Sequence, residues 1–102
     1  MKNNMITSSP ACSLSPAQLQ ERRNALIPGL LKQADNVTDV ADGLRLQFSH
    51  REGLLAELTR VIEQEQICCS FLRFQVSIEP TAGPITFDIS GPPGTREMLR
   101  AL

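Results

Sequence analysis

Three segments alternate apolar and polar residues with the period of two that is typical of half-buried β-strands. They are Leu44–Phe48, Leu72–Glu79 and Ile85–Ile89. The turn at 80–84 contains two prolines and separates the last two segments, so we expect these two to pair as a hairpin. The connector at 35–43 has room for one more short strand, at 36–38.

A helical spacing of apolar residues marks three further segments. Ser15 and Pro16 begin the first, where serine caps the helix and proline fits its first turn. Pro28 then interrupts this pattern, so we expect a kink or break there and a short helix to about residue 34. A second helix is predicted over about 52–67, and a final one follows Gly91–Thr95. The stripe of the second helix consists of Leu54, Leu55, Leu58, Val61 and Ile62.

These elements predict an α+β fold in the order α-β-α-β-β-α. An antiparallel sheet with its helices packed on one face, a two-layer sandwich, satisfies the pattern. The 102 residues suit one domain. We expect this domain to span 15–102, after a polar, flexible N-terminal arm at 1–14.

Composition and charge narrow the function classes. Ten basic and eleven acidic side chains give a net charge of −1, which argues against a nucleic-acid-binding protein. The first residues lack the apolar core of a secretion signal, and no apolar run is long enough to cross a membrane. We therefore expect a cytoplasmic location, where thiols stay reduced.

The candidate chemistry lies at the end of the second helix, in the segment Glu65–Phe71. Helical spacing places Glu65 one turn before Cys68 and Cys69, at the edge of the core. A thiolate beside a carboxylate at a helix C-terminus is disfavoured, which argues against a reactive nucleophile. A soft cation would instead be stabilised there, provided that the helix unwinds so that both sulfurs converge.

Cys12 is the third cysteine and would complete a three-thiolate site, with Glu65 as fourth ligand. Thiolates select soft or borderline ions such as Zn(II), Cu(I), Hg(II) and As(III). The Cys-Cys pair lacks the spacing of a structural zinc site. Two alternatives stay open: the cysteines are small core residues, or Cys68 and Cys69 form a strained vicinal disulfide.

Three segments resemble a family of small bacterial proteins with no established activity. They are Cys12–Pro16, Glu65–Phe74 and Gly91–Thr95, and the resemblance covers most of the chain from Cys12 onward. Members pair an N-terminal cysteine with a Glu-x-x-Cys-Cys-x-Phe segment, and some are associated with metal or mercury resistance. The resemblance implies that Cys12, Glu65, Cys68 and Cys69 belong to one site.

Two other candidates are better explained by structure. Gly91–Thr95 precedes a helix but lacks the lysine of a phosphate-binding loop, and its two prolines remove backbone donors. His50, the only histidine, is expected in a solvated turn.

The sequence thus predicts a thiol-based binding protein for a soft metal or metalloid and no catalytic residues. The competing hypotheses are a thiol enzyme or redox switch, in which Cys12 resolves Cys68 or Cys69, and a self-associating structural domain with buried cysteines. Under the self-associating hypothesis, an exposed sheet face or edge in so small a domain would favour a homodimer.

Overall fold

The computed structural model describes residues 26–102. The predicted arm at 1–14 and the predicted helix from Ser15 to the break at Pro28 therefore lie outside the described residues, apart from the last few positions of that helix. None of the helices between 26 and 102 is long and apolar enough to span a membrane.

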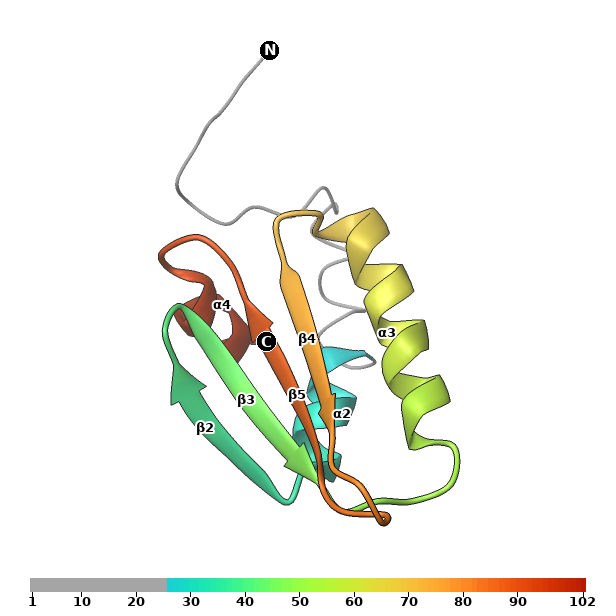
Figure 1. The fold of residues 1–102 in the computed structure, drawn as a ribbon. Helices are drawn as coiled ribbons and strands as arrows, with labels where there is room; N and C mark the ends of the chain where they lie inside the picture. The colour runs from blue at the N-terminus through green and yellow to red at the C-terminus, as the bar shows by residue number, and fades with distance from the viewer. Residues whose placement is uncertain (1–25) are drawn as a thin grey trace.

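The described elements follow the order α-β-β-α-β-β-α, which confirms the predicted α+β class and adds one full strand (Figure 1). Their bounds are α2 (Ile27–Gln33), β2 (Asn36–Val40), β3 (Gly43–Phe48), α3 (Leu54–Cys68), β4 (Arg73–Ile78), β5 (Ile85–Ser90) and α4 (Thr95–Arg100). All strand pairs are antiparallel, in the spatial order β2-β3-β5-β4. The hairpin predicted from the last two alternating segments is confirmed as β4–β5.

The sheet buries one face and leaves the other to solvent. The even-numbered residues of β3 and the odd-numbered residues of β5 are buried: Leu44, Leu46, Phe48, Ile85, Phe87 and Ile89. They form one core with the buried residues of the three helices, which places the helices on a single face. The opposite face carries polar side chains, among them a two-bond ion pair from Arg45 to Asp88 at 2.9 and 3.0 Å.

Pro28 lies in the first turn of α2, where a missing backbone N–H costs no helical hydrogen bond. The predicted break at this proline is therefore the start of a helix. The connector after α2 forms the complete strand β2, and the turn at Ala41–Asp42 joins it to β3. Asp42 adopts a left-handed conformation (φ 54°) in that turn.

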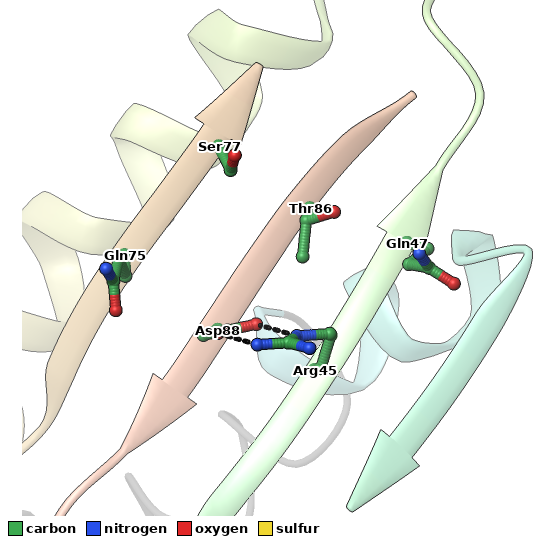
Figure 2. Close-up of a pocket in the computed structure, with 6 residues that line it drawn as sticks. All are labelled: Arg45, Gln47, Gln75, Ser77, Thr86 and Asp88. Carbon is green, nitrogen blue, oxygen red and sulfur yellow. Dashed lines mark hydrogen bonds and ion pairs between the residues drawn. The ribbon is translucent and has the colours of Figure 1, made fainter. Parts of the chain in front are cut away.

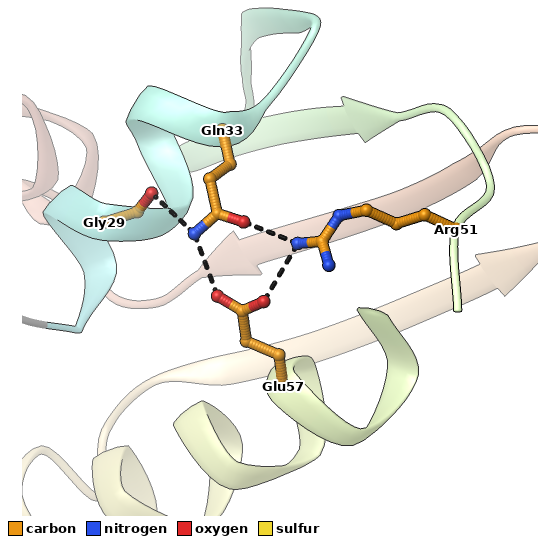
Figure 3. Close-up of polar contacts among 4 residues, drawn as sticks. All are labelled: Gly29, Gln33, Arg51 and Glu57. Atoms are coloured by element: carbon orange, nitrogen blue, oxygen red, sulfur yellow. Dashed lines mark hydrogen bonds and ion pairs between the residues drawn. The ribbon is translucent and has the colours of Figure 1, made fainter. Parts of the chain in front are cut away.

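Three polar side chains hold the beginning of α3 against α2 (Figure 3). Arg51 donates to the Glu57 carboxylate at 2.9 Å, and the Gln33 amide donates to its other oxygen at 2.9 Å. The Arg51 guanidinium also donates to the side-chain amide oxygen of Gln33 (Oε1). These bonds tie the loop before α3 to both helices.

The stability of the protein should depend on pH through this cluster. The Arg51 hydrogen bond, followed by that of Gln33, lowers the pKa of Glu57 below 4.5. Because the folded-state pKa is depressed, the stabilisation is complete above the unfolded pKa and is lost as the pH falls through the folded pKa. We expect Glu57→Gln to cost about 0.5–1 kcal/mol at neutral pH and less at low pH, measured by urea denaturation across the acid range.

Asp39 is a second carboxylate whose titration should affect stability in the same acid range as that of Glu57. Its hydrogen bond from Arg100 lowers its pKa as well, so Glu57→Gln should reduce the acid sensitivity without abolishing it. A variant as acid-sensitive as the wild type would contradict the role given to Glu57.

Candidate functional site: the cysteine end of helix α3

The buried stripe of α3 places Glu65 inside the core. Leu54, Leu58, Val61 and Glu65 are the buried residues of this helix, spaced four, three and four apart. Glu65 therefore occupies the next position of the apolar stripe, and its side chain is fully buried. The sequence predicted Glu65 at the edge of the core, but its side chain lies deeper, inside the core. Leu55, predicted within the stripe, is 41% exposed instead.

The helix ends between the two cysteines. The Cys69 N–H donates to the Glu65 carbonyl at 2.6 Å, which closes the last helical turn. Cys69 itself has non-helical backbone angles (φ −133°, ψ 72°), and its carbonyl accepts from the Leu72 N–H at 3.1 Å. The local unwinding that a shared ligand site requires is thus present. Cys69 is buried in the core, whereas Cys68 is half-buried beside it.

The two sulfurs are in different states. Cys69 is disulfide-bonded, and Cys68 carries a thiol. The two therefore do not form a vicinal disulfide with each other, and that alternative is wrong. Cys12, the third predicted ligand, lies outside the described residues.

The end of α3 disfavours an anion on either sulfur. The C-terminal end of a 15-residue helix carries partial negative charge, and the last turn of α3 has no basic residue to offset it. Glu65 adds a carboxylate in the low-dielectric interior, where a charge persists only with compensating interactions. A thiolate formed here gains from a nearby positive ion.

The described residues do not make a complete metal site by themselves. Within residues 26–102, no three His, Cys, Asp or Glu side chains are grouped so that they could hold a metal ion. Glu65, Cys68 and Cys69 are therefore not grouped as three ligands of one ion in this structure, in which Cys69 is disulfide-bonded.

The two secondary candidates have structural roles. The Thr95 side chain is buried, and its hydroxyl donates to the Pro92 carbonyl at 2.7 Å, which closes the turn before α4. α4 has only six residues. His50 is exposed in the turn after β3, as predicted.

A shallow hollow between polar side chains lies on the open face of the sheet, at a place that the sequence pattern did not single out (Figure 2). Its lining consists of Arg45, Gln47, Gln75, Ser77, Thr86 and Asp88. The polar half of each alternating segment was the signal for this surface. Because two guanidinium nitrogens of Arg45 donate to the two carboxylate oxygens of Asp88, the strongest charges of the hollow already neutralise each other.

Comparison of the chain with protein-family models, with curated proteins and with solved structures finds no match.

Proposed function

We propose that the cysteine end of α3 binds a soft metal ion or metalloid when its thiols are reduced, with Cys12, Cys68 and Cys69 as thiolate ligands and Glu65 as fourth ligand or orienting group. The supporting observation is that one helix end carries a disulfide-forming cysteine, a neighbouring thiol and, one turn back along the helix, a buried carboxylate. The role is that of a binding module for sequestration, sensing or transfer of the ion.

The choice of ion class rests on ligand chemistry. Thiolates bind soft and borderline ions in preference to magnesium or calcium, which take oxygen ligands. Zn(II), Cu(I), Hg(II) and As(III) are therefore the ions to compare. A helix end that disfavours free thiolates gains most from an ion that neutralises them.

A thiol redox switch is the second candidate, and the disulfide at Cys69 favours it. In this function, an external thiol reductant opens the disulfide and is itself oxidised, and an oxidant of the peroxide class reforms it. The two functions differ in what the reduced protein does: a binding module loads an ion tightly, whereas a pure switch does not.

A titration of the fully reduced full-length protein tests the proposal. The chain has no Trp and no Tyr, so thiolate-to-metal absorption is measured against a nearly empty near-ultraviolet background. We expect one ion to load per site, with protection of the thiols from alkylation. Cys12→Ser, Cys68→Ser and Cys69→Ser should each weaken binding by about tenfold or more.

Ser70→Ala is the matched control, because Ser70 is exposed next to the pair and should leave binding unchanged. If the reduced protein takes up none of the four ions but forms one defined disulfide, the redox function replaces the proposal. If the thiols stay unreactive in the native reduced protein and no ion binds, the cysteines serve packing alone.

A further inference from the structure

Among residues 26–102, β4 is an edge strand of the sheet. Two hydrogen bonds in the loops that flank the sheet show which way its peptide groups face. The Glu79 N–H donates to the Pro84 carbonyl at 3.3 Å, and the Gly91 N–H donates to the Asp42 carbonyl at 3.2 Å. Both lie in register with the adjoining ladders. Because residues of an antiparallel pair alternate between bonded and non-bonded positions, the odd-numbered residues of β4 bond to β5. The N–H and C=O groups of Phe74, Val76 and Ile78 therefore face the open edge.

The same three residues carry apolar side chains toward the helix side of the sheet. Phe74 stacks on Phe87 with ring centroids 5.8 Å apart, whereas Val76 and Ile78 are 37% and 56% exposed. Apolar side chains and outward peptide groups thus coincide on one strand. β4 contains no proline, no lysine and no inward charge, the devices that commonly block pairing at an edge.

The other edge of the sheet differs. β2 carries Asp39, which is ion-paired with Arg100 at 2.9 Å, and the Val40 carbonyl accepts from Arg96 at 3.0 Å. Asp39 lies opposite the buried Leu44, so β2 carries a charge on the helix side of the sheet, which is one of the devices that block pairing at an edge. Figure 1 shows β2 and β4 at opposite sides of the sheet, with α3 beside β4.

We propose that a second copy of this chain pairs with β4, antiparallel, across a two-fold axis at Val76. This register places Phe74 opposite Ile78 of the second copy and Val76 opposite its own counterpart, so the outward-facing residues of each strand meet as hydrogen-bonded pairs. It also places Arg73 opposite Glu79 of the second copy, and symmetry repeats this pair at the other end. The four described strands of each copy then join into one continuous sheet.

Other registers lack this complementarity. The nearest ones, with axes at Gln75 and Ser77, put Arg73 opposite Ser77 and Glu79 opposite Gln75, respectively, so neither pairs the two charges. An axis at Ile78 would put Pro80, which has no N–H, opposite Val76. An axis at Phe74 would put Leu72, a core residue that precedes the strand, opposite Val76. Only the axis at Val76 matches apolar with apolar side chains and a cation with an anion. The partner that best fits the edge of β4 is therefore β4 of a second copy of the chain.

The first test is the mass of the full-length protein in solution, by light scattering after gel filtration, with reductant present to exclude disulfide-linked dimers. We expect a dimer for the wild type and a monomer for Val76→Pro. Proline removes an N–H that points away from β5, so the variant should still fold, which a thermal melt followed by circular dichroism checks. Val37→Pro is the matched control, because Val37 lies at an outward-facing position of β2 and should leave the dimer intact.

Charge reversal tests the register. Arg73→Glu and Glu79→Arg should each weaken the dimer by about tenfold, because each places like charges opposite one another at both ends of the strand. The double variant Arg73→Glu/Glu79→Arg should restore the wild-type dissociation constant. A wild type that is monomeric at every concentration, a dimer that survives Val76→Pro, or a double variant that dimerises no better than the single ones would overturn the proposal. Slow hydrogen exchange of the Val76 amide in a monomer would show that the same chain covers its own edge, which also overturns it.

Discussion

Replacing Glu65 with alanine is expected to lower the free energy of unfolding by about 3 kcal/mol. The Glu65 side chain is fully buried on the core stripe of α3, so the substitution removes a well-packed side chain and leaves uncompensated the interactions that offset its charge. Chemical denaturation at neutral pH measures the loss. The effect should be large because buried ionic groups are costly to disrupt from one side, whatever their net contribution.

Two further variants show whether the buried position of Glu65 or its charge causes the loss of stability. Glu63→Ala removes the same functional group from an exposed position two residues away and should change stability by less than about 0.5 kcal/mol. Glu65→Gln keeps the size of the side chain but not its charge, so it reports on the charge alone. If Glu65→Ala costs no more than Glu63→Ala, the buried carboxylate has no structural role, and its position must be explained by binding.

The regular strands were predictable because their residues alternate strongly. The β4–β5 hairpin and β3 follow from this pattern, since one face packs on the core and the other meets solvent. β2 was predicted only as a short segment because none of its residues is buried, so its apolar signal is weak. Its full length depends on pairing with β3 and on contacts from α4, which are tertiary and leave no local pattern.

The candidate site was predictable only in part. The end of α3 at the cysteine pair followed from the apolar stripe and the strand after it. The depth of Glu65 did not, because a carboxylate at a core position reads as a polar residue in any hydrophobic pattern. The same limit explains Leu55: its apolar side chain fits the predicted stripe, but the helix turns it 41% to solvent once the core follows Leu54, Leu58 and Val61.

Gly43→Ala is expected to destabilise the protein by about 3 kcal/mol or more. Gly43 begins β3 opposite Ser90, and a Cβ atom there would lie 2.0 Å from the Ile89 carbonyl oxygen and 2.7 Å from the Ser90 Cα. Both atoms belong to the backbone of a central strand, so relief requires β3 and β5 to separate at this end, with loss of packing around Leu44 and Ile89. The close approach of the two backbones also explains why a glycine occupies this position, directly after the β2–β3 turn.

Gly29→Ala provides the matched comparison. Gly29 lies within α2, and nothing is within 4 Å of the added Cβ. Because alanine loses less backbone entropy than glycine on entering a helix, we expect this variant to be more stable by about 0.5–1 kcal/mol. The same chemical change should therefore have opposite signs at the two sites, as measured by urea denaturation. A mild cost for Gly43→Ala would mean that β3 and β5 can shift apart at this end of the sheet at little expense.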